Sequence, residues 1–213
     1  MTTPSPHVAA FDDAFARCPL VAILRGVRSD EVEAIGDELV DAGFTLIEVP
    51  MNSPDPLDSV ARLARRFAGR AVIGAGTVLR VQDVAAMADA GGTMVISPNA
   101  NTAVIAASAE AGLASLPGIA TPTEAFAALE AGATALKLFP AEAGGPPVLK
   151  AMLAVLPRGT RVLPVGGIAP DTMAAWRGAG AAGFGLGSAL YKPGMTAAEA
   201  GRNARAFVTA LNG

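Results

Sequence analysis

The chain is poor in the residues that form disulfides, metal clusters and imidazole-based catalytic sites. Its 213 residues include one cysteine and one histidine. Cys18 alone cannot form an intramolecular disulfide or a thiolate cluster, and we interpret it as a small buried hydrophobic residue. His7 alone argues against a zinc site with several imidazoles and against a Ser/His/Asp triad. We therefore expect no metal site.

Charged residues are scarce as well, and no apolar run is long. Lys, Arg, Asp and Glu make up 16% of the chain, the net charge is -3, and no run of five basic residues occurs. This composition has no electrostatic footprint for nucleic acid or acidic lipids, so we expect a small-molecule partner. With no span of about 18 apolar residues, we expect no membrane helix. Residues 1–10 lack the pattern of a signal peptide, which favours a cytoplasmic location.

A small residue followed by glycine repeatedly precedes a short β-rich run. Ala42-Gly43 precedes Phe-Thr-Leu-Ile-Glu-Val, and Ala131-Gly132 precedes Ala-Thr-Ala-Leu-Lys-Leu-Phe. Glycine there fits the position just after a helix, where a positive φ costs nothing sterically. Similar glycines occur at 69, 91, 112, 159 and 180. Their spacing predicts strand–helix units of about 20 to 27 residues.

Eight strand-like runs alternate with helix-like stretches. The runs are 20–24, 45–49, 71–75, 94–97, 114–116, 135–138, 161–165 and 183–186, and the stretches include 30–41, 56–67, 81–90, 123–130, 170–177 and 196–211. This alternation predicts an α/β protein whose eight units form one (β/α)8 TIM barrel domain over residues 1–213, with residues 1–10 as a loose leader. An open doubly wound sheet is the alternative, but its Gly-x-Gly-x-x-Gly is missing after the first run.

One lysine interrupts an apolar strand of this predicted barrel. Lys137 lies in Ala-Leu-Lys-Leu-Phe-Pro, and the chain has only three lysines. Burial there would lower its pKa and keep part of it as a nucleophilic amine, which can attack a ketone. The alternative is a lysine whose stem is buried while its head reaches the barrel mouth. We interpret Lys150 and Lys192 as surface residues, in a helix and a loop.

A carboxylate occupies a similar position on the second strand. Glu48 lies in Thr-Leu-Ile-Glu-Val-Pro, where burial is costly unless the group is paired or protonated. It can exchange protons with a Lys137 adduct, or form a structural ion pair with Lys137. Arg25 offers a planar fork for a carboxylate and Thr77 a hydroxyl, and either can instead stabilise the barrel rim.

The last two strands end in glycine-rich segments. Gly166-Gly167 follows the seventh run, and Gly187-Ser188 follows the eighth. Many barrels bind phosphate at this place through backbone amides, so these segments favour a phosphate-bearing ligand. Tight turns without a ligand are the alternative reading.

From about residue 19 to residue 211 the chain resembles the 2-keto-3-deoxy-6-phosphogluconate (KDPG) aldolase family. The motifs are Ala-Ile-Leu-Arg-Gly, Ile-Glu-Val-Pro, Ile-Gly-Ala-Gly-Thr-Val, Ser-Pro-Asn, Leu-Lys-Leu-Phe-Pro-Ala and Val-Gly-Gly-Ile. The resemblance implies a class I aldolase, a carbon–carbon lyase that needs no cofactor. It splits a phosphorylated 2-keto-3-deoxy sugar acid into pyruvate and D-glyceraldehyde 3-phosphate, usually as a homotrimer.

The resemblance also implies roles for individual residues. Lys137 matches the Schiff-base lysine of the family, and Glu48 its proton-shuttling glutamate. The other matches are with positions that bind the keto acid and aldehyde portions (Arg25, Thr77, Pro98, Phe139, Val165) and the phosphate (Gly166, Gly167, Gly187, Ser188).

Two positions depart from the gluconate-type members of the family. Those members usually have an arginine four residues after the glutamate and a threonine before the Gly-Gly pair, where this chain has Asn52 and Val165. Both changes resemble the galactonate-type branch. Val165 in place of threonine also removes a hydrogen-bond partner for a sugar hydroxyl, which can change discrimination between epimers. The expected substrate is therefore 2-dehydro-3-deoxy-6-phosphogalactonate, in D-galactonate breakdown.

Other readings stay open. Within the family, the gluconate epimer or dual specificity is the alternative. From other classes, a carboxylate–metal-dependent epimerase on the same barrel would be abolished by a chelator. A catalytically silent barrel that only binds a phosphorylated metabolite would release no pyruvate.

Overall fold

The computed structural model describes residues 4–213, and its strands form two parallel sheets. The larger sheet has six strands in the order β5-β4-β3-β2-β1-β9, and the smaller has three in the order β6-β7-β8. The strands are β1 (Leu20–Ile23), β2 (Leu46–Pro50), β3 (Val72–Gly76), β4 (Met94–Ile96), β5 (Ala114–Leu116), β6 (Gly118–Ile119), β7 (Leu136–Leu138), β8 (Val162–Pro164) and β9 (Phe184–Leu186). The chain is thus an α/β protein, as the alternation predicted, and each predicted run overlaps an observed strand.

Backbone contacts link the two sheets at both edges of the smaller one. At one edge, β5 runs through Pro117 into β6, and the Thr134 N–H donates to the Ser115 carbonyl over 2.8 Å. At the other edge, Val165 after β8 forms a parallel bridge with Gly185 of β9. The predicted strand 114–116 is therefore continued by one further element, β6, and the smaller sheet has no free edge along these contacts.

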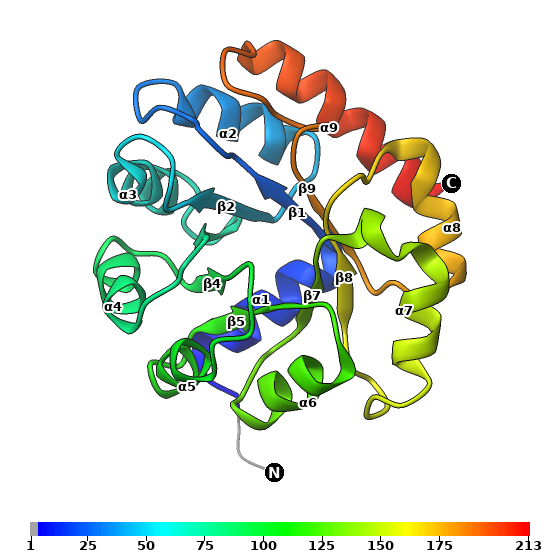
Figure 1. Cartoon of the computed structure of the whole chain (residues 1–213). Coiled ribbons are helices and arrows are strands. Elements are labelled where there is room, and N and C mark those ends of the chain that lie inside the picture. The colour runs from blue at the N-terminus through cyan, green and yellow to red at the C-terminus, as the bar shows by residue number, and fades with distance from the viewer. Residues whose placement is uncertain (1–3) are drawn as a thin grey trace.

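All helices but the first surround the strands, and the first lies behind them across the middle of the view in Figure 1. The helices are α1 (Pro6–Arg17), α2 (Val32–Asp41), α3 (Pro56–Arg66), α4 (Val81–Asp89), α5 (Thr102–Glu110), α6 (Pro122–Glu130), α7 (Gly145–Leu153), α8 (Met173–Gly178) and α9 (Ala197–Asn212), with 3₁₀ turns η1 (Ala141–Ala143) and η2 (Pro170–Thr172). Capping boxes begin α6 and α9, where Thr121 and Thr196 pair with Glu124 and Glu199. In residues 4–213 no helix has the length and apolar character that crossing a membrane requires.

The first helix lies where a loose leader was expected. Of the leader residues 1–10, residues 1–3 lie outside the described part of the chain, whereas residues 6–10 form the first turns of α1. The Ser5 side chain accepts from the Val8 N–H and caps this helix, and a proline stands at its first position. Phe11 and Phe15 of α1 are buried against apolar residues from the strands. This apolar contact is the reason that the segment is helical and docked.

Strand residues alternate between two apolar clusters. Leu46 of β2 belongs to a cluster with the buried residues of α1, whereas Ile47 belongs to the cluster shared with the outer helices. In β7 the same alternation places Leu136 toward the outer helices. Because side chains point to opposite faces with a period of two, Glu48 and Lys137 lie on the inner face. The strands thus carry both groups into the interior.

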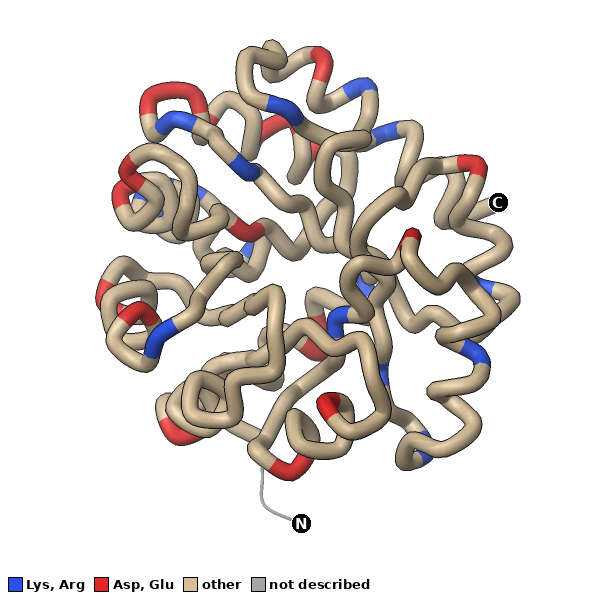
Figure 2. Tube along the Cα trace, in the orientation of Figure 1, with Lys and Arg blue, Asp and Glu red and all other residues tan. Residues whose placement is uncertain are grey.

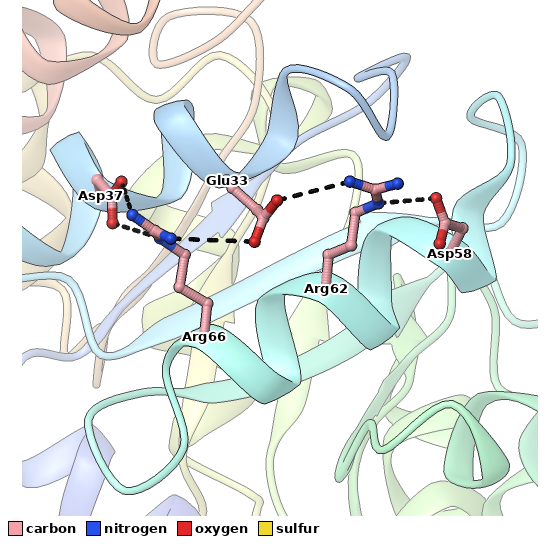
Figure 3. A network of polar contacts seen from close by, with 5 residues as sticks. All are labelled: Glu33, Asp37, Asp58, Arg62 and Arg66. Atoms are coloured by element: carbon pink, nitrogen blue, oxygen red, sulfur yellow. Dashed lines mark hydrogen bonds and ion pairs between the residues drawn. The ribbon is translucent and has the colours of Figure 1, made fainter.

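Most charged residues lie on the outer helices and loops (Figure 2). A network of such residues joins α2 to α3 (Figure 3). Arg66 donates to both carboxylate oxygens of Asp37 over 2.7 and 2.6 Å, and Arg62 pairs with Asp58 and Glu33 over 2.9 and 3.5 Å. Each pair is well exposed and contributes about 0.2–1 kcal/mol. These contacts orient neighbouring helices rather than supply the core stability.

Candidate active site

Lys137 is a nearly buried amine on strand β7. It lies in the middle of β7, between Gly118 of β6 and Leu163 of β8, and is 5% exposed. Burial lowers the pKa of Lys137 because it penalises the ammonium form, and the positive charge of Arg25 lowers it further. The negative charge of Glu48 opposes both effects. The result is a larger fraction of neutral amine near pH 7 than an ordinary lysine has.

The ring of Phe139 lies beside this amine. The distance from Lys137 Nζ to the ring centroid is 4.9 Å, within the range of a cation–π contact. An aromatic face stabilises a positive charge without supplying a proton acceptor. It therefore suits a nitrogen that alternates between amine and protonated imine.

Glu48, on strand β2, lines the same internal cavity as Lys137. It lies in β2 between Ile23 of β1 and Gly74 of β3, and is 1% exposed. Burial raises the pKa of Glu48, against the lowering influence of the Lys137 and Arg25 charges. Its Oε2 has no hydrogen-bond partner among the described residues. A small internal cavity is lined by both Glu48 and Lys137.

The two groups do not form the structural ion pair that was the alternative reading. Among residues 4–213, no nitrogen–oxygen contact within 4 Å joins Lys137 to a carboxylate. A buried carboxylate without a donor is costly, so such atoms in proteins call for an explanation. One explanation that fits this geometry is that Glu48 exchanges a proton with a ligand bound at Lys137.

Gly76, at the end of β3, leaves room for the Glu48 carboxylate. A Cβ at this position would overlap Glu48 Oε2 and lie 2.6 Å from its Cδ. We predict that Gly76→Ala displaces the carboxylate and lowers kcat by about 100-fold, since a misplacement near 1 Å has that effect. Gly178→Ala is the matched control, because a Cβ there meets nothing within 4 Å. Steady-state pyruvate release by both variants tests this, and equal rates would contradict it.

Arg25 is oriented by two side chains from neighbouring strand ends. Its Nη1 donates to Asn52 Oδ1 over 2.7 Å and to Thr77 Oγ1 over 3.4 Å. Thr77 has a φ of 55°, an uncommon conformation for a threonine and one that costs of order 1–3 kcal/mol. The guanidinium is thus held at the carboxyl ends of β1, β2 and β3, where it can accept a carboxylate ligand.

A cavity of about 520 Å³ opens beside Lys137 and extends to the glycine-rich segments. Of the residues predicted for the site, it is lined by Arg25, Lys137, Phe139, Val165, Gly166, Gly167, Gly187 and Ser188. Gly166 and Gly167 have φ values of 107° and 67°, which residues with a side chain rarely adopt. The cavity is large enough for a small phosphorylated acid.

The glycine-rich segments present free backbone donors. Gly187 accepts hydrogen bonds from the N–H groups of Leu190 and Tyr191, which closes a helical turn after β9. In residues 4–213, the N–H groups of Gly167 and Ser188 donate to no protein acceptor. Backbone donors at the start of such turns are suited to an anion.

Three predicted site residues lie outside this cavity, and two of them, Thr77 and Pro98, line neither cavity. Thr77 reaches the site only through Arg25, and Pro98 follows β4 without lining the cavity. The carbonyl of Pro98 instead packs against Gly118 of β6, where a Cβ would overlap it. The structure therefore brings the other nine predicted residues together, counting Glu48 in the internal cavity beneath.

Some residues of the site were not among those predicted. Asn52 was noted only as a departure from the family pattern, yet it is the closest side-chain partner of Arg25. Tyr191 and Lys192 line the cavity, and Lys192 is also the exposed loop residue that was expected. Their position three and four residues after Ser188, in the loop that follows the last strand, was the available signal.

Comparison with known proteins gives one consistent answer. A sequence model of the KDPG and KHG aldolases matches residues 11–203. The chain is 45% identical to 2-dehydro-3-deoxy-6-phosphogalactonate aldolase of Escherichia coli K12, over 91% of this chain and 95% of that protein. The solved native KDPGal structure superposes with a TM-score of 0.91 at 45% identity, covering 92% and 95% of the two chains.

A more distant relative was solved with a reaction intermediate. The KDPG aldolase of Legionella pneumophila, with pyruvate captured as a covalent carbinolamine, superposes with a TM-score of 0.79 at 26% identity, covering 92% of this chain and 94% of that one. The family resemblance inferred from the motifs is confirmed. The chain belongs to the KDPG and KHG aldolase family.

Proposed function

We propose that this aldolase cleaves 2-dehydro-3-deoxy-6-phosphogalactonate into pyruvate and D-glyceraldehyde 3-phosphate through a Schiff base at Lys137. The observation that carries the proposal is the shared interior space of Lys137, with its lowered pKa, and Glu48, with its unpartnered Oε2. The carbinolamine captured in the Legionella relative supports the same chemistry here. The greater identity to galactonate-type than to gluconate-type relatives supports the substrate.

The reaction begins at the C2 ketone of the substrate. The neutral amine of Lys137 attacks C2, and the carbinolamine loses its hydroxyl as water, using a proton from Glu48. The product is a protonated imine at Lys137. The Arg25 guanidinium holds the neighbouring carboxylate, which fixes C2 against the amine.

Cleavage then moves electrons toward the imine. Glu48 accepts the proton of the C4 hydroxyl, the C3–C4 bond breaks, and its electron pair forms an enamine as C4 becomes an aldehyde. Glu48 returns this proton to C3 of the enamine, and water then hydrolyses the imine to release pyruvate and free Lys137. The protonated imine is itself the electron sink, so this route uses neither a metal nor an organic cofactor.

Glyceraldehyde 3-phosphate retains the phosphate of the substrate. We assign that group to the donors of Gly166, Gly167, Gly187 and Ser188. Phe139 and Val165 contact the carbon chain, and Thr77 acts through Arg25. Pro98 shapes the aldehyde side from behind Gly118 rather than from the cavity wall.

The proposed architecture is one (β/α)8 barrel domain covering the chain. The continuity of β5 with β6 and the bridge from Val165 to Gly185 support closure into eight strands. We further propose a cytoplasmic homotrimer. Exposed apolar side chains support an interface between copies, since Leu79, Val81 and Phe126 are 47, 49 and 46% exposed.

The substrate is tested by pyruvate release from the galactonate and gluconate epimers side by side, in a lactate dehydrogenase-coupled assay with and without a chelator. We expect the galactonate epimer to react faster and the chelator to have no effect. A gluconate-biased or equal ratio contradicts the choice of substrate, and inhibition by the chelator contradicts the imine route.

We predict that Val165→Thr changes the ratio of kcat/KM for the galactonate and gluconate epimers. Val165 is 7% exposed, lines the cavity and packs over Gly185, so threonine adds a hydroxyl in nearly the same volume. One added hydrogen bond is worth about 0.5–1.5 kcal/mol, so the relative kcat/KM of the gluconate epimer should rise about 2- to 10-fold. Val162→Thr, at the start of β8 and in the outer cluster, is the control. An unchanged ratio in Val165→Thr would show that this position does not discriminate.

A further inference from the structure

Lys192 brings a third cation to the cavity, besides Arg25 and Lys137. It lies in the loop between β9 and α9, four residues after Ser188, and lines the same cavity as Arg25 and Lys137. Its side chain is exposed, and no carboxylate of residues 4–213 lies within 4 Å of its Nζ. Within the described residues, the Lys192 ammonium therefore forms no ion pair.

The residue before Lys192 is firmly held. Tyr191 is 3% exposed, and its hydroxyl donates to Glu31 Oε1 over 3.1 Å. Burial and this carboxylate raise the pKa of Tyr191, so the hydroxyl keeps its proton. Leu190 is buried as well, and its carbonyl accepts from Asn203 Nδ2 of α9 over 3.0 Å. The backbone on the N-terminal side of Lys192 is therefore held in place by Leu190 and Tyr191.

The residue after Lys192 is in close contact with the first strand's loop. Pro193 packs on Gly26, where a Cβ would lie 2.7 Å from the proline Cγ and where φ is 77°. Anchors on both sides thus restrict the backbone of Lys192, while only its side chain is free to move. Lys192 thus lines the cavity from a restrained backbone position.

Three cations line the cavity, and one carboxylate lies next to its glycine-rich segments. Arg25 and Lys137 serve the keto acid end, beside Glu48. At the glycine-rich end the Glu142 carboxylate lies against the backbone, since Cβ atoms at Gly166 and Gly167 would lie 2.9 and 2.7 Å from its Oε2. Glu142 does not line the cavity, but a dianion bound to this backbone would lie near its negative charge. Lys192 is the lining cation that remains to offset it.

We propose that the Lys192 ammonium binds the phosphate group of the substrate, together with the backbone donors of the glycine-rich segments. This rests on the proposed function, because it assigns the phosphorylated end of the same substrate. Hydrogen bonds to the phosphate are charge-assisted whichever group donates them, and the ammonium adds the attraction of its full positive charge for the dianion. A lysine on an anchored loop thereby favours phosphorylated over unphosphorylated keto-deoxy acids.

The test compares Lys192→Met and Lys192→Arg with the wild type on the phosphorylated substrate and on unphosphorylated 2-dehydro-3-deoxygalactonate. We expect Lys192→Met to raise KM for the phosphorylated substrate about tenfold, the loss of one charge-assisted contact, with a smaller change in kcat. KM for the unphosphorylated acid should not change, and Lys192→Arg should restore most of the affinity. Lys150→Met, an exposed lysine of α7 outside the cavity, is the control.

Inorganic phosphate provides a readout that does not depend on turnover. We expect it to raise the melting temperature of the wild type and of Lys150→Met, and to do so less for Lys192→Met. An unchanged KM and an unchanged phosphate response in Lys192→Met would overturn the proposal, as would equal rises in KM for both acids. If the wild type released no pyruvate from either epimer, the proposed function would fail while the phosphate response still tested Lys192.

Discussion

Lys137→Met should lower kcat for pyruvate release by about 10⁴-fold or more, because loss of the nucleophile removes the covalent route and leaves only binding. Methionine keeps the length and apolar stem of the lysine, so the strand packing of β7 is retained. The substituted protein should also fail to gain mass when it is treated with borohydride and pyruvate. The wild type should gain one three-carbon unit, at Lys137.

The same variant should be at least as stable as the wild type. Burial lowers the pKa of Lys137, so the unfolded chain holds that proton more tightly than the folded chain. The folded state is therefore disfavoured at pH values below the unfolded pKa, and methionine removes this penalty. Thermal unfolding at pH 7 measures it.

Lys150→Met is the matched control for both measurements, since Lys150 lies exposed on α7. It should keep wild-type activity and accept the three-carbon unit. Borohydride labelling of Lys137→Met, or an unlabelled wild type, would contradict a Schiff base at this residue.

Local chemistry predicted the strand positions well. Gly43 and Gly132, expected to end helices with a positive φ, have φ values of 107° and 100°. Each is followed by a strand, β2 and β7, that was predicted within a residue or two. These elements follow from turn sterics and short β-rich runs, which depend on neighbours along the chain.

The elements that were missed depend on contacts distant in sequence. Helix α1 was hidden in a leader rich in Pro and Thr, although Phe11 and Phe15 have helical spacing. Its stability comes from packing on the inner strand cluster, which a local pattern does not reveal. Helix α7 begins with Gly-Pro-Pro, a sequence that resembles a turn until the first position of a helix is considered.

The residues of the site likewise fall into those that a local sequence pattern predicts and those that depend on contacts distant in sequence. Lys137 and Glu48 could be singled out because a charge in an apolar strand is conspicuous, and alternation then places both on one face. The contact of Asn52 with Arg25 and the place of Lys192 on the cavity wall depend on how three loops meet. Loop geometry is set by the packing of the strands that precede them, so the sequence alone did not predict these contacts.

Glu48→Gln should lower kcat by about 10²- to 10⁴-fold, the usual range for loss of a general acid–base group. Glutamine keeps the shape of the side chain but can neither supply nor accept the proton at the C2 and C4 hydroxyls. Imine formation should persist at a reduced rate, because the Lys137 amine remains. The protein should lose no stability, since an unpartnered buried carboxyl is replaced by a neutral group.

The pH dependence separates this role from a purely structural one. The Glu48 charge raises the pKa of Lys137, whereas burial and Arg25 lower it. Glutamine removes the raising influence, so the pKa of Lys137 should fall further and more amine should be present at a given pH. The acid limb of borohydride trapping with pyruvate, measured against pH, should therefore move to lower pH in Glu48→Gln. Glu110→Gln, exposed at the end of α5, should leave the limb and kcat unchanged. An unmoved limb with full activity in Glu48→Gln would mean that Glu48 is not coupled to the lysine.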